Sequence, residues 1–101
     1  MTNQISSNER EAKIIEAYRH IGDTVYSAIF NVPGEEPRLE SEKICYIEVG
    51  PDRIDFYGED EIFICELENV GKWKFDRLSS FSQSDIEEEI KKWWKKKLNL
   101  D

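Results

Sequence analysis

The chain has a single histidine, His20, and this limits the chemistry available to it. A catalytic arrangement of the Ser-His-Asp or Cys-His kind needs a histidine as its base, and the sequence has no Gly-x-Ser-x-Gly turn to present a nucleophile. Two cysteines and one histidine are too few for the usual structural zinc site. The five glycines are scattered, so they form no phosphate-binding loop. We therefore predict a protein that is not an enzyme, with no catalytic residues, no metal ligands and no cofactor.

Carboxylates are abundant, and two of them superficially match a nuclease pattern. Pro51-Asp52 followed by Glu89-Ile90-Lys91 has the residue types of the Pro-Asp…Glu-x-Lys arrangement of metal-dependent nucleases. That chemistry needs the second carboxylate and the lysine on a strand beside the first, whereas Glu89 and Lys91 lie in a predicted helix. Several carboxylates converging in one concave site would instead indicate an enzyme.

The acidic side chains allow two interpretations. The formal net charge of the 101-residue chain is −8, which disfavours nucleic-acid binding and favours attraction to a basic protein. The acidic groups then form either a solvated surface or a binding surface for a basic partner. The candidate partner-binding residues lie in one predicted loop and at two predicted turns: Glu35, Glu36, Glu40, Glu42, Asp52, Glu59, Asp60 and Glu61.

The stretch Lys91–Lys97 places two tryptophans, Trp93 and Trp94, among five lysines. It suits contact with an anionic membrane, nucleic acid or an acidic protein, or it is a helix whose tryptophans pack on a sheet. Helical spacing of the tryptophans with Ile86, Ile90 and Leu98 favours packing. No run approaches the roughly 20 apolar residues of a membrane span, and no signal peptide is evident. We expect a cytoplasmic protein with no direct nucleic-acid contact and no membrane span.

The elements that position these residues are centred on Lys43–Leu67. Three runs separated by turn residues, Ile44–Val49, Arg53–Tyr57 and Ile62–Leu67, predict an antiparallel three-stranded meander. The third run is apolar on both faces, so a spare apolar face of Tyr46, Ile62 and Ile64 is a possible interface. Cys45 and Cys65 fall on the first and third strands, so we expect two buried free thiols.

The flanking segments complete an α+β fold. The spacing predicts a helix from Ser6 to about His20, a strand over Thr24–Val32 and an acidic loop over 33–42. A short strand over Lys72–Asp76 and a helix beginning within Phe81–Asp85 follow. Residues 1–5 are expected to be a loose terminus. The predicted core residues are Ile14, Tyr18, Ile21, Ile29, Ile47, Phe56, Phe63, Cys65, Leu67, Trp73, Ile90 and Trp94.

We thus predict one α+β domain over residues 1–101, with an antiparallel four- to five-stranded meander sheet and the two terminal helices packed on it. No motif points to a known family. The expected function is a small acidic interaction protein that binds and inhibits a basic protein, of the immunity or anti-defence type. Two alternatives are a subunit or homodimer joined through the apolar sheet face, and a small-molecule-binding module with a cavity between sheet and helix.

Overall fold

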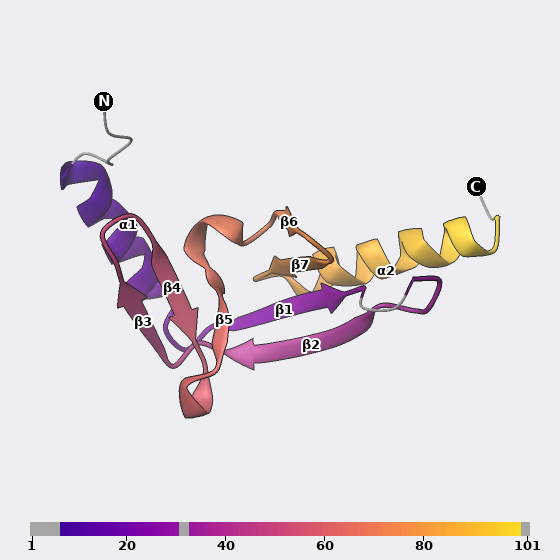
Figure 1. The fold of residues 1–101 in the computed structure, drawn as a ribbon, viewed down its shortest axis with the longest axis horizontal. Coiled ribbons are helices and arrows are strands. Elements are labelled where there is room, and N and C mark those ends of the chain that lie inside the picture. The colour runs from indigo at the N-terminus through magenta and orange to yellow at the C-terminus, as the bar shows by residue number, and fades with distance from the viewer. Residues whose placement is uncertain (1–6, 31–32, 100–101) are drawn as a thin grey trace. The chain divides into compact units, whose positions relative to one another are not determined.

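A computed structural model describes residues 7–30 and 33–99 of the chain. The predicted tail over residues 1–5, the cap Ser6 and the strand residue Val32 lie outside this described part. Figure 1 shows the elements. They are α1 (Ser7–Arg19), β1 (Thr24–Ile29), β2 (Arg38–Lys43), β3 (Tyr46–Val49), β4 (Ile54–Tyr57), η1 (Glu59–Glu61), β5 (Phe63–Glu66), η2 (Leu67–Asn69), β6 (Trp73–Lys74), β7 (Arg77–Ser80) and α2 (Gln83–Lys97).

The chain divides into two compact units, which we describe separately. Unit 1 combines Met1–Asp23 with Lys43–Glu68, and unit 2 combines Thr24–Glu42 with Asn69–Asp101. Each unit therefore joins segments that lie far apart in the sequence. Each also has its own antiparallel sheet and its own terminal helix. The α+β class with antiparallel sheets is confirmed, but the prediction of one meander sheet is wrong, because the seven strands of the described residues form a four-stranded and a three-stranded sheet.

Unit 1 contains the predicted meander, in the order β3-β4-β5, with α1 against β3 and β4. Both connections are closed by backbone hydrogen bonds. The amide of Gly50 donates to the Arg53 carbonyl at 2.8 Å, and the amide of Gly58 donates to the Ile62 carbonyl at 2.8 Å. Short connections of this kind permit only antiparallel neighbours.

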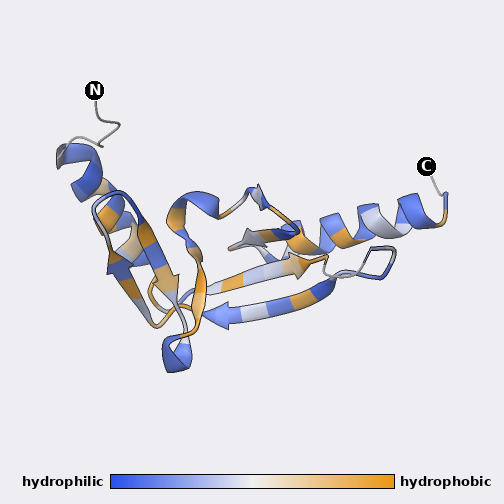
Figure 2. Cartoon of the chain, viewed as in Figure 1, coloured by the Kyte–Doolittle hydropathy of each residue, from blue (hydrophilic) through white to orange (hydrophobic). Residues whose placement is uncertain are grey.

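The core of unit 1 lies between α1 and the meander. Phe56 and Ile44 are fully buried, and Figure 2 shows that β5 is largely hydrophobic. On α1, Ala17 is buried, whereas Tyr18 on the helix and Ile21 just after it are exposed, contrary to prediction. The three short strands form a narrow surface. Helix α1 can lie close to it because it contacts the sheet through the small side chain of Ala17, and the apolar residues on either side extend past the sheet.

Unit 2 is built on a four-stranded sheet of order β2-β1-β7-β6. Its two central strands pair in antiparallel fashion, with Tyr26 opposite Ser80 and Ile29 opposite Arg77. Strand β7 was missed because its polar sequence resembles a loop, and the predicted strand over Lys72–Asp76 is reduced to the two residues of β6. Strand β2 occupies the second half of the segment expected to be an acidic loop.

The core of unit 2 forms where α2 crosses β1 and β7. Ala28, Leu78 and Ile86 are buried together, and the partly buried Tyr26, Phe30 and Ile90 pack against them. On the same pair of strands Ser27 and Ser79 are buried, and their hydroxyl oxygens form a hydrogen bond of 2.9 Å. Helix α2 begins after Ser82, as expected, and packs against both central strands.

The predicted core list is therefore partly wrong. Among its members, Ile29, Phe56 and Cys65 are buried, while five aromatic or aliphatic side chains are exposed. Those five are Tyr18, Ile21, Phe63, Trp73 and Trp94. Two small units have a smaller total interior than one domain of the same chain length would have. The reason is that the fraction of surface buried on folding falls as a unit becomes smaller.

The packing of α2 predicts unequal effects on stability for two substitutions, one within the helix and one at the residue that caps its C-terminus. Ile86→Ala should lower the free energy of unfolding by about 3 kcal/mol, because Ile86 is fully buried and the change leaves a cavity. Leu98→Ala should change it by roughly 0.5 kcal/mol or less, because Leu98 is exposed. Urea unfolding followed by circular dichroism measures both. Equal effects would contradict this assignment of the core.

Candidate functional site

The negative charge of the chain is concentrated in unit 1. By sequence, unit 1 has 12 acidic and 5 basic side chains, a net charge of −7, whereas unit 2 has 10 acidic and 9 basic side chains, a net charge of −1. The eight predicted partner-binding residues fall in both units. Unit 1 contains Asp52, Glu59, Asp60 and Glu61, and unit 2 contains Glu35, Glu36, Glu40 and Glu42.

Two of the unit 2 carboxylates are engaged within that unit. Glu36 accepts a hydrogen bond of 3.1 Å from the indole nitrogen of Trp94. Glu40 pairs with Arg38 at 3.0 Å and lies 3.8 Å from Arg77. Glu42 is half-buried on β2, and Glu35 is exposed in the turn after β1. These four residues are therefore less suited to form one acidic binding surface than the sequence suggested.

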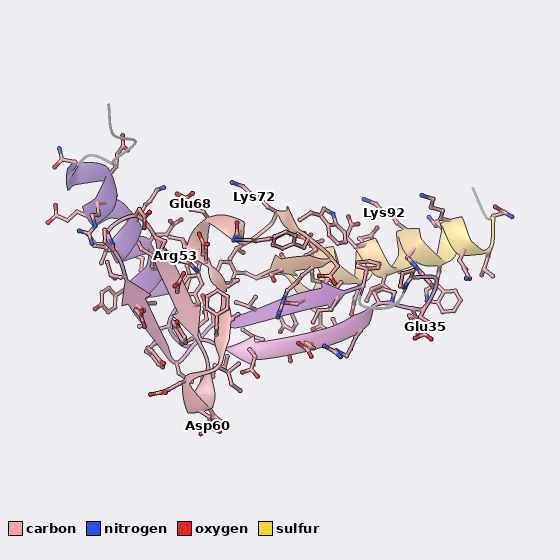
Figure 3. The ribbon with its side chains drawn as sticks, viewed as in Figure 1. Glu35, Arg53, Asp60, Glu68, Lys72 and Lys92 are labelled. Carbon is pink, nitrogen blue, oxygen red and sulfur yellow. The ribbon has the colours of Figure 1, made fainter. Side chains whose placement is uncertain are left out.

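Three acidic residues of unit 1 are consecutive and exposed, in the turn η1 between β4 and β5. Figure 3 shows Asp60 at the tip of this turn. Asp60 and Glu61 have φ values of 55° and 60°, a left-handed conformation that is uncommon for residues other than glycine. Asp52 precedes β4 whereas η1 follows it, so the meander separates Asp52 from the other three.

An aromatic strip lies beside this acidic turn. Tyr46 is opposite Tyr57 on the neighbouring strand, and Tyr57 is opposite Phe63 on the next. The rings of Tyr46 and Tyr57 stack with centroids 5.1 Å apart and planes 5° from parallel. The edge of Phe63 meets Tyr57 at 5.7 Å. Cross-strand register explains the strip, because residues opposite each other project on the same face of a sheet.

The predicted apolar interface needs correction at one residue. Tyr46 and Ile62 are exposed as expected, but Ile64 is 2% exposed and belongs to the interior. The exposed neighbour of Ile62 is Phe63, which was predicted to lie in the core. Tyr57 and Phe63 were missed as surface residues, because only the pairing register of β3, β4 and β5 aligns them with Tyr46 and the sequence pattern leaves that register open.

Electrostatics connect the aromatic strip to the acidic turn. Desolvation raises the pKa of the Tyr46 hydroxyl above its ordinary value, and the nearby carboxylate of Glu61 raises it further. Desolvation likewise raises the pKa of Tyr57, with Glu48 adding to it. We call the set Tyr46, Tyr57, Glu59, Asp60, Glu61 and Phe63 the acidic–aromatic edge of unit 1.

Several cations of unit 1 are engaged in its own structure. Arg53 contacts both oxygens of the buried Asp55, at 2.9 and 3.2 Å from Nε, and reaches Glu66 at 3.3 Å. The hydrogen bond with Asp55 raises the pKa of Arg53. Asp55 and Glu66 are direct neighbours across β4 and β5, so Arg53 offsets the repulsion between them.

The basic side chains of α1 show the same pattern. Arg10 donates to the carbonyl of Gly50 at 2.9 Å, and Lys13 pairs with Glu68, which raises the pKa of Lys13. A hollow beside them, also lined by Arg53, has a volume of about 20 Å³. That is room for about one water molecule, so the hollow is too small for a substrate.

The histidine and the two cysteines lie in different local environments. His20 follows α1, where its Nδ1 lies 2.9 Å from Asp23 and its ring meets Phe56 edge-on at 6.1 Å. Cys65 is buried but Cys45 is exposed, so the prediction of two buried thiols is wrong at Cys45; neither cysteine forms a disulfide. Within residues 7–30 and 33–99, no group of three or more His, Cys, Asp or Glu is placed to hold a metal ion.

The lysines of α2 are partly neutralised by their own helix. Lys92 pairs with Glu89 at 3.2 Å, and Lys91 lies 3.8 Å from Glu88. Lys97 donates to the Gly34 carbonyl at 3.0 Å and lies over the Trp93 ring. Trp93 is half-buried, whereas Trp94 is 40% exposed, so the expectation that both indoles pack on the sheet is wrong for Trp94.

Comparison of the chain with protein-family models, with curated proteins and with solved structures found no match. In the part of the chain that the structure describes, no helix has the length and apolar character needed to cross a membrane.

The effect of the Glu61 carboxylate on the pKa of the Tyr46 hydroxyl can be tested by substitution. Glu61→Gln should lower the pKa of Tyr46 towards that of free tyrosine, because it removes a negative charge that disfavours the phenolate. Glu59→Gln should have a smaller effect. Carbon-13 NMR of the tyrosine ring carbon bonded to the hydroxyl, followed through alkaline pH, measures both.

The same shift sets the sign of a stability effect. Because Tyr46 binds its proton more tightly in the folded state, its contribution to stability is constant below pH 10 and declines as pH rises through the folded pKa. A Tyr46 titration unchanged by Glu61→Gln would contradict the placement of Glu61 beside the strip.

Proposed function

We propose that the chain is a non-enzymatic interaction protein that binds a basic protein through the acidic–aromatic edge and inhibits it by covering its basic surface. The observation that carries this proposal is the Tyr46–Tyr57–Phe63 strip, exposed at Tyr46 and Phe63 and half-buried at Tyr57, beside three consecutive exposed carboxylates. The two features are complementary to one kind of partner, a surface with lysine or arginine side chains around an apolar centre.

The two parts of the edge have different physical roles. Carboxylates on a unit of net charge −7 accelerate encounter with a positive surface and exclude negatively charged ones. Tyrosine and phenylalanine rings supply contact area with few rotatable bonds, and Tyr46 and Tyr57 are already stacked before a partner arrives. Arginine or lysine side chains of the partner can also lie over the ring faces.

The unusual backbone of η1 supports a binding role rather than a solubilising one. Asp60 and Glu61 have left-handed φ values, each of which costs roughly 1 kcal/mol or more in residues other than glycine. A turn that served only to reverse the chain would be more stable with glycine at such a position. The cost is consistent with a need for carboxylates at this site.

Paired neutralisations of equal charge test the proposal. The partner is first captured from the native host with the full chain as bait and identified by mass spectrometry. Glu59→Gln with Glu61→Gln should then lower its association rate about tenfold at low salt, because both carboxylates lie on the proposed edge. The effect should shrink in high salt, where charges are screened. Surface plasmon resonance at several salt concentrations measures it.

The matched control is a pair of substitutions on helix α1, outside the acidic–aromatic edge. Glu11→Gln with Glu16→Gln removes the same charge from exposed positions of α1 in unit 1. This pair should change the rate by about twofold or less. Equal losses for the two pairs would show general charge attraction without a defined edge, and binding insensitive to salt and to both pairs would overturn the proposal.

Self-association through the same strip is a second candidate function, favoured by the exposure of Ile62 and Phe63 beside Tyr46. In that case sedimentation velocity should show a concentration-dependent dimer. Ile62→Lys should abolish the dimer, because it would place a charge in an apolar contact. The exposed Ile15→Lys on α1 is the control. A strict monomer at high concentration would remove this candidate.

A further inference from the structure

Unit 2 has an open groove that the proposed function does not use. It lies between the β6–β7 hairpin and the N-terminal half of α2, and its volume is about 360 Å³. This is within the usual range for ligand pockets, about 300–1,000 Å³. Its lining residues are Gly71, Trp73, Leu78, Ser80, Asp85, Glu88, Glu89 and Lys92.

An aromatic ring forms part of the lining. Trp73 is 49% exposed, so part of its indole is open to a ligand. The ring is held by Phe30, whose centroid lies 5.1 Å away at a tilt of 47°. The buried Leu78, opposite Trp73 across the β6–β7 pair, also lines the groove and belongs to the core of unit 2. The groove thus has a fixed apolar side.

Helix α2 supplies the charge of the groove. Asp85, Glu88 and Glu89 recur at helical spacing, so they project from one side of the helix. The Ser80 hydroxyl donates to Asp85 at 3.4 Å, which helps to orient that carboxylate. Lys92, labelled in Figure 3, is the cation of the lining and pairs with Glu89 at 3.2 Å. Three carboxylates and one ammonium give the groove a formal charge of −2. Carboxylates therefore do converge in one concave site, the feature that would indicate an enzyme, but Lys92 pairs with one of them. Within the described residues they are not placed to hold a metal ion together.

We propose that this groove binds an organic cation, an alkylammonium or guanidinium group whose apolar part lies on Trp73 and whose charge faces Asp85 and Glu88. Tryptophan has the most favourable ring face for a cation, and a carboxylate beside it supplies the counter-charge. An inorganic ion gains little from an indole. The same chemical group occurs in a free polyamine and in a lysine or arginine side chain, so the tests below distinguish these two sources.

Lys92 has a defined role in this proposal. Its ammonium, paired with Glu89, lies where it competes with an incoming cation for the carboxylates of the groove. Removing this internal cation should therefore strengthen binding. A purely structural role for the pair of Lys92 with Glu89 would predict no such gain.

The test uses the full chain labelled with nitrogen-15 and titrated at low salt with two probes, spermidine and a short lysine-rich peptide, and with magnesium as the inorganic control. Chemical shift changes of the Trp73 indole and of the Asp85–Lys92 backbone amides should report a dissociation constant of about 0.1–1 mM, because the groove is open. Saturation by spermidine assigns a free polyamine as ligand. Saturation by the peptide alone assigns a basic side chain.

Four single substitutions separate the groove from general charge. Glu88→Gln should weaken binding about threefold to tenfold, whereas Glu87→Gln, on the adjacent residue and outside the groove, should leave it unchanged. Trp73→Leu should weaken it about threefold, because it keeps an apolar surface but removes the ring face. Lys92→Gln should strengthen it about threefold. Circular dichroism of each variant verifies that the fold is retained.

Three results would overturn the inference: no saturable shift at the groove with either probe, equal losses for Glu87→Gln and Glu88→Gln, or equal affinity for magnesium and spermidine. The failure of this inference leaves the proposed function intact, because the acidic–aromatic edge belongs to unit 1 and is measured with different variants. Failure of the partner-binding test likewise leaves this titration interpretable.

Discussion

The pairing of β1 with β7 is the constraint on which the rest of the structure depends. It joins residues that lie about fifty positions apart in the chain, with Ser27 opposite Ser79 and a buried hydrogen bond between their hydroxyls. Closing so long a loop has an entropic cost that burial under α2 must offset. Ala28, Leu78 and Ile86 provide that burial. The segment that contains β3, β4 and β5 lies between these two strands in sequence and pairs with neither of them. It forms a separate meander, which α1 covers.

Two small units have a different balance of surface and interior from one larger domain. Each unit contains about half of the chain, and small units bury a smaller fraction of their apolar side chains. The aromatic and aliphatic residues that a single core would have enclosed are therefore exposed, among them Phe63 in unit 1 and Trp73 and Trp94 in unit 2. Both proposed sites include one of these rings, Phe63 in the acidic–aromatic edge and Trp73 in the groove. In each case carboxylates lie beside the ring and favour a cationic ligand.

The division into two units also determines how the charged side chains are distributed. The cations of unit 1 that have defined partners bind to its own backbone and carboxylates, as Arg10 does to Gly50 and Arg53 to Asp55 and Glu66. The carboxylates of the turn η1, in contrast, are exposed. In unit 2 the net charge is small because 10 acidic side chains nearly balance 9 basic ones. On α2, Lys91 and Lys92 also pair with glutamates three residues earlier on the helix. A sequence-wide charge of −8 therefore describes neither unit.

The sequence by itself determined the elements whose signals are local. Period-two alternation with Gly50-Pro51-Asp52 and Gly58 at the turns predicted the meander. A start within Phe81–Asp85 and the apolar stripe of Ile86 and Ile90 predicted α2, although the exact cap was left open. Tertiary structure alone decided which strands share a sheet, because that depends on the partners of β1 and not on its own residues. It made Arg77–Ser80 a central strand despite a polar composition, since its small serines fit between β1 and the rest of unit 2. It also decided which apolar residues stay outside, because periodicity identifies the apolar side of an element but not the extent of the surface that covers it.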